Sequence, residues 1–259
     1  MTAADTIVSV TALGIRLPDP ARRGWINALD SVDLDLAAGR TTAVVGETGA
    51  GKSMLLAALV GLLPTGAQVR GSILHHCVDG TTDLLRISDR QWRRLRGRQI
   101  GWWSQQAMFT ATRTVRSQLQ EACPTAPLAD LAVQCRLVPP LLDRRPHELS
   151  GGELRRAAAV AALLHEPALL LADEPTAGLG IADIAAVSDL LAERRRRDHA
   201  AVVVTHELDF AASIADTIAV MRDGRVVEHG PVDRVLAEPS HPYTRALVVA
   251  GRLGAKEDQ

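Results

Sequence analysis

Short runs of apolar residues recur along this chain, and longer segments with a helical spacing of apolar residues alternate with them. The runs lie at residues 41–45, 168–172 and 201–205. The helical segments lie at residues 150–164, 181–197 and 209–215. Runs without alternation are typical of parallel strands buried on both faces. The pattern therefore predicts an α/β protein with a central parallel sheet.

The first part of the chain has a different pattern. Residues 31–36 read Ser-Val-Asp-Leu-Asp-Leu, and this period of two is typical of a strand with one face in water. We predict β-structure over residues 7–36, interrupted by a proline-rich loop at 18–24. A turn region at 64–71 is expected before a short strand around Ile73. These elements predict an N-terminal β subdomain.

The middle of the chain is expected to be helical. Residues 88–98 predict a basic surface helix, and a short apolar strand follows at Ile100–Trp103. The helical pattern over 115–142 is broken by prolines, which favours a helical subdomain inserted into the sheet domain. We expect a core over about 1–104 and 165–237, a helical subdomain over about 105–164 and a tail at 238–259. A strand at 217–221 is expected to turn back at Asp223-Gly224.

Composition narrows the class of protein. The chain has 259 residues, a net charge of −1 and 47% hydrophobic residues, which is typical of a globular protein and gives no basic excess for nucleic acid. The longest apolar stretches are too short to cross a membrane, and the first residues do not resemble a secretory signal, so we expect a cytoplasmic compartment. Cys77, Cys123 and Cys135 are expected to be reduced structural thiols. The run at 194–197, four arginines, is expected to be a solvated helix end.

A glycine-rich segment follows the first apolar run and opens a helical one, which is the context that a phosphate-binding loop requires. Its backbone N–H groups and helix dipole suit an anion, Lys52 supplies a point charge for the outer phosphates, and Ser53 is placed to hold Mg²⁺. The only other lysine is Lys256. The segment is Gly46, Glu47, Thr48, Gly49, Ala50, Gly51, Lys52 and Ser53.

Two further strands end in polar residues that suit nucleotide chemistry. Asp173 and Glu174 follow the run at 168–172, at the strand edge where ligands bind in open α/β sheets. Asp173 can hold Mg²⁺, and Glu174 can polarise a water for attack on the γ-phosphate. His206 follows the next run and can contact the γ-phosphate. The sequence therefore predicts a nucleoside triphosphate site with Mg²⁺.

A second anion site is predicted at Ser150-Gly151-Gly152-Glu153. Ser150 and Glu153 form a capping box, so an ordinary helix start would account for those two residues. Two glycines in the first turn are costly for capping alone, and they favour close approach of the backbone to a ligand. Two separate phosphate-binding helix ends predict a dimer that encloses nucleotide.

With these motifs, the sequence resembles the ATP-binding cassette (ABC) family over about residues 7–249. Residues 46–53 are similar to the Walker A motif, 149–153 to the signature, 169–174 to Walker B, His206 to the switch histidine and Gln105 to the Q-loop glutamine. The resemblance implies a P-loop NTPase sheet domain with an inserted helical subdomain and an N-terminal antiparallel β subdomain. It also implies hydrolysis of ATP with Mg²⁺ in a head-to-tail dimer. Gln105 would link Mg²⁺ and water to the membrane partner.

Two stretches, at 146–152 and 241–247, look like the ATPases of the peptide/nickel importer branch. This implies an ATPase subunit at the cytoplasmic face of the membrane that energises uptake of peptides, nickel or metal-chelate complexes. The implied partners are integral membrane permease subunits, a second ABC subunit and, indirectly, an extracytoplasmic substrate-binding protein. Because no cysteines follow Cys135, the chain resembles the shorter nickel- or metallophore-type members.

Four positions depart from the family pattern. Gly180 stands where the D-loop aspartate is expected. Leu17 stands where the family has an aromatic residue that stacks on adenine, and Trp25 is a candidate substitute for it. Residues 106–107 replace Asp-Pro. Such differences favour one subunit of a heterodimer. The alternatives are a degenerate regulatory ABC subunit, supported by Gly180 and Leu17, and a non-transport ABC ATPase acting on DNA or ribosomes.

Overall fold

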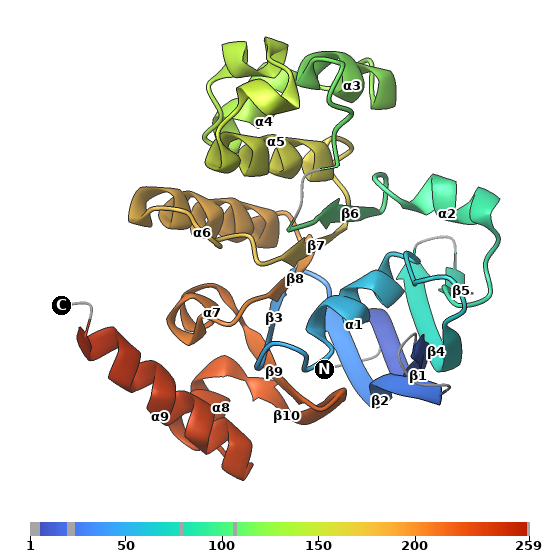
Figure 1. The fold of residues 1–259 in the computed structure, drawn as a ribbon, viewed down its shortest axis with the longest axis vertical. Coiled ribbons are helices and arrows are strands. Elements are labelled where there is room, and N and C mark those ends of the chain that lie inside the picture. The colour runs from blue at the N-terminus through green and yellow to red at the C-terminus, as the bar shows by residue number, and fades with distance from the viewer. Residues whose placement is uncertain (1–5, 20–23, 78–79, 106–107, 258–259) are drawn as a thin grey trace.

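The computed structural model describes all of the chain except residues 1–5, 20–23, 78–79, 106–107 and 258–259. A six-stranded sheet runs through the middle of the molecule in the order β10-β9-β3-β8-β7-β6 (Figure 1). All of its neighbouring pairs are parallel except β9 and β10. The strands are β3 (Thr41–Val45), β6 (Ile100–Trp103), β7 (Leu169–Asp173), β8 (Ala200–Val204), β9 (Thr217–Arg222) and β10 (Arg225–Pro231). The predicted parallel sheet is confirmed.

The apolar runs are continuous because both faces of this sheet are covered. In β8, Val203 belongs to one hydrophobic core while Val202 and Val204 belong to the other, and all three are fully buried. Successive side chains of a strand point to opposite faces, so a strand between two cores needs an apolar residue at every position. The predicted hairpin turn is also present, because Asp223 and Gly224 both have positive φ between β9 and β10.

A second, antiparallel sheet has the order β2-β1-β4-β5 and packs beside the first with α1 between them (Figure 1). Its strands are β1 (Thr6–Asp19), β2 (Gly24–Ala37), β4 (Gln68–Cys77) and β5 (Gly80–Asp83). This is the predicted N-terminal β subdomain, although the sequence analysis did not predict β5.

Two predicted loop boundaries were wrong. Of the loop at 18–24, Pro18 pairs with Trp25 and Asp19 with Gly24, and residues 20–23 lie outside the described part of the chain. Pro18 is tolerated because β1 pairs with β4 only as far as Arg16, so no second neighbour needs its missing N–H. The turn region at 64–71 also ends early, because β4 begins at Gln68.

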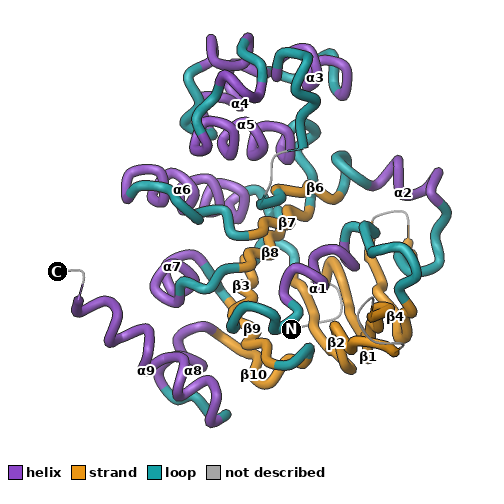
Figure 2. The backbone as a smooth tube through the Cα atoms, viewed as in Figure 1, coloured by secondary structure: helices purple, strands orange, loops and turns teal. Residues whose placement is uncertain are grey.

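Helices cover the parallel sheet on both sides and form a separate group beyond its β6 end (Figure 2). On one side lies α1 (Lys52–Leu59), and on the other lie α6 (Ile181–Arg196) and α7 (Leu208–Ile214). The separate group contains α3 (Val115–Ala122), α4 (Leu128–Gln134) and α5 (Gly151–Leu163). The remaining helices are α2 (Asp89–Leu95), α8 (Val232–Ala237) and α9 (Pro242–Glu257).

The prolines shape the helical group as expected. Pro127 lies at the N-cap of α4, and Pro139 begins a short 3₁₀ helix at Pro139–Asp143. Proline is accepted at the start of a helix because the first N–H groups have no partner within the helix. A second 3₁₀ turn, Pro146–Glu148, leads into α5.

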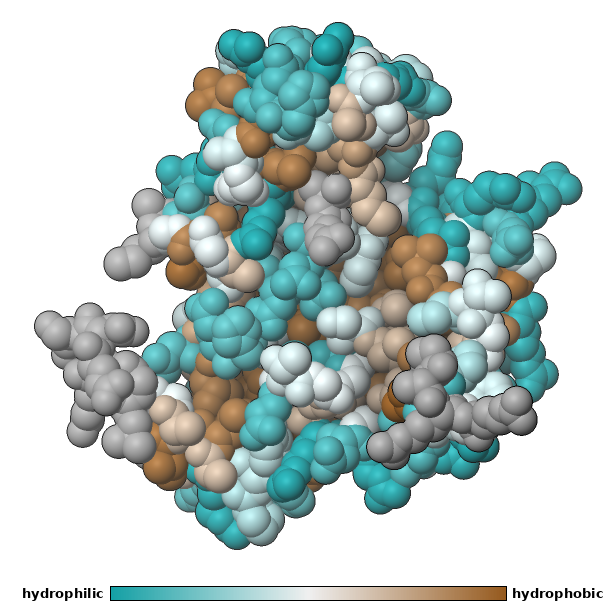
Figure 3. All heavy atoms as spheres, viewed as in Figure 1, coloured by the Kyte–Doolittle hydropathy of each residue, from teal (hydrophilic) through white to brown (hydrophobic). Residues whose placement is uncertain are grey.

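On the face in Figure 3, exposed apolar residues form separate patches divided by hydrophilic surface.

The run of arginines is not fully solvated, which corrects the prediction. Arg194 is 6% exposed and donates from Nη2 to the carbonyl oxygen of Pro167 at 2.5 Å, and burial lowers its pKa to about 10. A buried guanidinium is accepted here because it bonds the loop before β7. The other three arginines of the run are exposed, as predicted.

The cysteines are free thiols in this structure. Cys77, Cys123 and Cys135 all lie in the described part of the chain, and no disulfide joins them. Burial raises the pKa of the Cys135 thiol to about 12. Among the helices that the structure describes, none combines the length and the apolar character needed to span a bilayer.

Candidate active site

The phosphate-binding segment joins the carboxyl end of β3 to the start of α1. Its turn needs glycine at Gly46 and Gly51, which have φ of +151° and +100°. A Cβ at Gly46 would lie 2.2 Å from the carbonyl oxygen of Met221, and one at Gly51 would lie 2.7 Å from that of Ala28. The backbone of neighbouring strands therefore presses against the loop and fixes its path.

Lys52, the first residue of α1, is held inside the loop. Its side chain is 8% exposed, and Nζ donates to the carbonyl oxygens of Gly46 at 2.6 Å and Glu47 at 3.0 Å. Burial lowers the pKa of Lys52, while the nearby carboxylates of Glu174 and Asp173 act in the opposite direction. The ammonium is thus pre-positioned in the loop, with uncharged carbonyl partners that a phosphate anion can replace.

Ser53, in the first turn of α1, meets Asp173 at the end of β7. The Ser53 hydroxyl donates to Oδ1 of Asp173 at 3.3 Å. Burial raises the pKa of Asp173, and the hydrogen bond from Ser53 acts against this shift. A hydroxyl and a carboxylate oxygen at one point are the hard donors that Mg²⁺ accepts. These two residues therefore fit a magnesium ion that also has phosphate oxygens and water as ligands.

Glu174 follows β7 in a left-handed conformation with φ of +50°, and its N–H donates to the carbonyl oxygen of Val204 at 2.9 Å. Its carboxylate faces Nδ1 of His206, which lies 3.0 Å from both oxygens. Glu174 is the more enclosed partner, with 14% of its side chain exposed against 63% for His206. A non-glycine residue with positive φ is uncommon and strained, and its backbone bond to β8 helps to hold it there.

One cavity of about 410 Å³ collects most of the predicted site residues. We call it the phosphate-loop cavity; its lining is Ile26, Asn27, Ala28, Thr48, Gly49, Gly51, Lys52, Ser53, Met54, Gln105, Asp173 and Glu174. His206 reaches it through Glu174. Gly46, Glu47 and Ala50 form the back of the loop and do not line the cavity.

Ser150 and its glycines lie elsewhere. Ser150 caps α5, with the Glu153 N–H donating to Ser150 Oγ at 3.3 Å and the Ser150 N–H donating to Oε2 of Glu153 at 2.8 Å. A Cβ at Gly151 would meet no atom within 4 Å, so nothing in this chain requires that glycine. The segment Ser150, Gly151 and Gly152 does not line the phosphate-loop cavity of its own chain.

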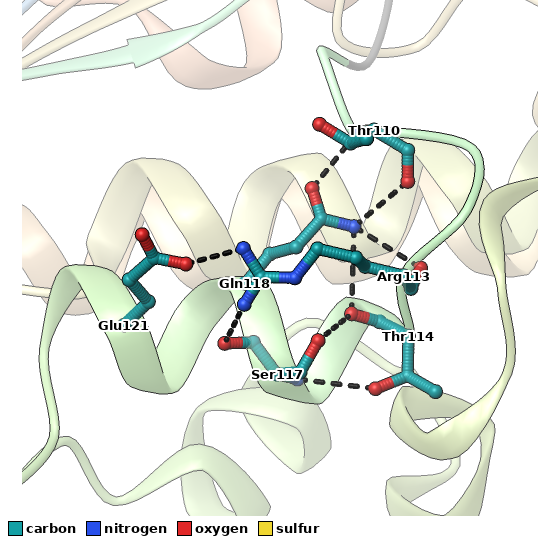
Figure 4. Close-up of polar contacts among 6 residues, drawn as sticks. All are labelled: Thr110, Arg113, Thr114, Ser117, Gln118 and Glu121. Atoms are coloured by element: carbon teal, nitrogen blue, oxygen red, sulfur yellow. Dashed lines mark hydrogen bonds and ion pairs between the residues drawn. The ribbon is translucent and has the colours of Figure 1, made fainter.

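Gln105 lies just beyond β6 and is exposed. Residues 106–107, where the sequence departs from the family pattern, lie outside the described residues. The segment that follows is bound firmly to α3 (Figure 4). Gln118 accepts from the Thr110 N–H at 2.8 Å and donates back to the Thr110 carbonyl at 3.0 Å, while Arg113 pairs with Glu121. The chain beyond Gln105 is therefore coupled to the helical group.

Neither Leu17 nor Trp25 lines the phosphate-loop cavity. Leu17 is half-buried and packs against the core under the antiparallel sheet. Trp25 is 42% exposed, stacks with Arg16 at 5.5 Å from the guanidinium carbon to the ring centroid, and does not line the phosphate-loop cavity. Ile26 does line it. The prediction that Trp25 substitutes for the missing aromatic therefore gains no support from the cavity lining.

Two contributions to the site were missed from the sequence. The wall at 26–28 comes from β2, whose register against the phosphate loop is set by tertiary contacts. Tyr243, in the first turn of α9, accepts a hydrogen bond from the Glu47 N–H at 3.0 Å. The motif at 241–247 indicated that this stretch matters, but it did not indicate that the stretch contacts the phosphate-binding loop.

A glycine-rich loop between a parallel strand and a helix, with a buried lysine and acidic residues at the next strand ends, defines a P-loop nucleotide-binding protein. Residues 29–177 match the family model described as ABC transporter. The chain therefore belongs to the ABC transporter family and carries the ATPase domain of that family.

Relatives extend this likeness over most of the chain. It is 33% identical over 244 residues to the oligopeptide transport ATP-binding protein OppD of Bacillus subtilis, covering 88% of this chain and 67% of the relative. It is 35% identical over 242 residues to the dipeptide transport ATP-binding protein DppD of the same organism, covering 87% and 71%. The dimeric post-hydrolysis structure of the ATP-binding cassette MJ0796, bound to ADP and Pi, shares the fold with a TM-score of 0.76 at 23% identity, covering 87% of this chain and 98% of that one.

Proposed function

We propose that this chain binds ATP with Mg²⁺ in the phosphate-loop cavity and hydrolyses ATP to energise an importer for peptides, nickel or metal-chelate complexes. The observation that carries the proposal is the convergence of Lys52, Ser53, Asp173 and Glu174 on one cavity. The names of the relatives, which are oligopeptide and dipeptide transport ATP-binding proteins, favour peptides among these substrates.

The residues of the loop bind and orient the triphosphate. Lys52 exchanges its carbonyl partners for phosphate oxygens, and the N–H groups around Gly49 and Gly51 face the same anion. Ser53 and Asp173 would hold Mg²⁺, which neutralises phosphate charge when bound. Gln105 lines the same cavity and would contact water and the metal's ligands from the side of the helical group.

Glu174 is placed to orient the attacking water. Its carboxylate lies beside Asp173 at the cavity wall, and the Nδ1–H of His206 fixes its direction. With Nδ1 used in this way, Nε2 of His206 remains for the terminal phosphate. Hydrolysis at this site therefore uses Glu174 for the water and His206 for positioning both the carboxylate and the phosphate.

A second cassette completes the site. Ser150, Gly151 and Gly152 form a helix N-terminus that stays outside the cavity of their own chain, and they would bind the triphosphate of a partner cassette. Gly180 and Leu17 favour a homologous partner over an identical one. The solved dimer of a cassette with the same fold supports a paired arrangement.

The remaining partners follow from this role. The proposed assembly contains integral membrane permease subunits, receives substrate from an extracytoplasmic binding protein and places this chain at the cytoplasmic face of the membrane. The exposed side chain of Met108 is 75% accessible in the segment after Gln105 and offers an apolar contact to a permease. A degenerate regulatory subunit is the second candidate, because Leu17 and Ile26 give the base no aromatic platform.

The test is reconstitution of the complete transporter in vesicles, with ATP hydrolysis measured on addition of binding protein loaded with oligopeptide, nickel or a metal chelate. We expect one loaded form to stimulate hydrolysis and transport together. If Glu174→Gln in this chain leaves both rates unchanged, the regulatory alternative is favoured.

A further inference from the structure

The segment before α9 is tied to strand β10 by one carboxylate. Oε1 of Glu228 accepts from the N–H and the hydroxyl of Ser240, both at 2.8 Å, and Oε2 accepts from the His241 N–H at 3.0 Å. Burial alone would raise the pKa of Glu228, but these donors and the nearby Thr244 hydroxyl lower it to about 2. The carboxylate therefore stays charged and fixes where α9 begins.

This anchor sets the position of Tyr243. Its N–H donates to Nδ1 of His241 at 3.1 Å, its side chain is 7% exposed, and the guanidinium carbon of Arg222 lies 4.9 Å from the ring centroid. The ring is therefore held by both α9 and the end of β9. Its hydroxyl reaches the N–H of Glu47, a residue 196 positions away in the sequence, at 3.0 Å.

Glu47 is held through both of its backbone polar groups. Its N–H donates to Tyr243, while its carbonyl oxygen accepts from Nζ of Lys52 at 3.0 Å and from the Ala50 N–H at 3.1 Å. A glycine-rich loop has many accessible conformations, so a small number of such bonds selects the one that receives phosphate. Tyr243 thus contacts the loop at the residue whose carbonyl oxygen accepts from Lys52.

We propose that Tyr243 is a positioning residue for the phosphate loop, so that the C-terminal segment 240–245 sets the affinity for nucleotide. This inference rests on the proposed nucleotide site. The hydroxyl orders the loop before nucleotide arrives. Without it, the free-energy cost of ordering the loop is added to the binding step. Nucleotide affinity should fall, while hydrolysis of bound ATP, which depends on Glu174, should change little.

The test compares Tyr243→Phe with Ser188→Ala in the full chain. Each variant removes one hydroxyl, but that of Ser188 donates to the carbonyl oxygen of Ile184 within α6 at 3.2 Å and lies outside the segment 240–245. We expect Tyr243→Phe to raise the Kd for Mg·ADP in calorimetry, and the KM for Mg·ATP, about 3- to 10-fold, with kcat within about 2-fold of wild type. Ser188→Ala should leave Kd and KM unchanged.

Hydrogen exchange of the peptide covering residues 46–53, without nucleotide, gives a second readout. Exchange at the Glu47 amide should be faster in Tyr243→Phe than in Ser188→Ala. Equal Kd values for wild type and Tyr243→Phe, or a fall in kcat at constant KM, would overturn the proposal. If wild type itself fails to bind Mg·ADP, the proposed nucleotide site is wrong. Separately, equal exchange at the Glu47 amide in wild type and Tyr243→Phe would overturn the contact with Tyr243.

Discussion

Nδ1 of His206 lies 3.0 Å from both carboxylate oxygens of Glu174. The residues come from neighbouring parallel strands, β7 and β8, and meet because both strands end at the same edge of the sheet. The backbone at Glu174 is strained, with φ of +50°, and a strained residue at a cavity wall is typical of a functional position. Glu174 is thus held by its own peptide and by the imidazole.

Replacing Glu174 by glutamine should separate binding from hydrolysis. The amide keeps the size of the side chain but cannot act as a base, so Glu174→Gln should retain ATP binding and lose at least ~10²-fold in turnover. The measurement is steady-state phosphate release with the Kd for Mg·ATP determined in parallel. Glu207→Gln, which changes a nearby carboxylate bonded to Thr176, is the control. Wild-type turnover in Glu174→Gln would remove Glu174 from the mechanism.

Removing the Lys52 ammonium should weaken binding itself. Lys52→Ala deletes a charge-assisted contact worth roughly 1.5–3 kcal/mol, so the Kd for Mg·ATP should rise by about one to two orders of magnitude. Calorimetry at constant ionic strength is the measurement. Arg86→Ala, which removes an exposed charge paired with Asp83 outside the cavity, should leave the Kd unchanged. An unaltered Kd in Lys52→Ala would contradict the phosphate-loop assignment.

Glu228 should make the free energy of unfolding of the chain depend on pH in the acid range. Its pKa is lowered from 4.5 to about 2 in the folded chain, so the unfolded chain binds its proton first as pH falls. The stabilisation is complete above the unfolded pKa and disappears as pH falls from about 4.5 towards 2. We expect Glu228→Gln to lower the free energy of unfolding by roughly 1–2 kcal/mol at pH 7.

Denaturant unfolding of wild type and Glu228→Gln at several pH values checks this prediction. The difference between the two should shrink with falling pH and vanish near pH 2, provided that the chain remains folded there. Glu238→Gln, a change at the end of α8, is the control and should not reproduce this pH dependence. A difference that stays constant with pH would show that the carboxylate's charge is not what anchors the segment.

The sequence could predict what depends on local patterns. Continuous apolar runs indicated β7 and β8, and glycine spacing indicated the turn at residues 46–53. Capping chemistry indicated the start of α5 at Ser150. These signals are local because propensity, capping and phosphate-loop geometry act over a few residues.

What remained unpredicted depends on contacts between distant segments. Tyr243 meets Glu47 only after α9 has packed beside the sheet, and Ile26 lines the cavity only through the register of β2. Arg194 was expected in water, yet it is buried against the carbonyl of Pro167. A charge pattern alone cannot show which arginine of a run finds a buried acceptor.

Position 180 offers a test of subunit pairing. Gly180 is the N-cap of α6 with φ of −77°, and a Cβ there would meet no atom within 4 Å. Aspartate is a favoured N-cap residue, so Gly180→Asp should fold normally and gain a few tenths of a kcal/mol in stability over glycine. The fold therefore does not require glycine here. A carboxylate can be introduced at this position to test subunit pairing.

We expect the purified wild-type chain to be largely monomeric, with low ATPase activity, and to become active with a homologous second cassette and two membrane subunits. In a Glu174→Gln background with Mg·ATP, Gly180→Asp should increase the dimeric fraction measured by light scattering, because a carboxylate can then form contacts across the dimer. Gly180→Ala is the matched control, since it adds the Cβ without the charge. A wild-type homodimer that hydrolyses ATP at the full rate of the assembled transporter would contradict the heterodimer hypothesis and leave the family assignment intact.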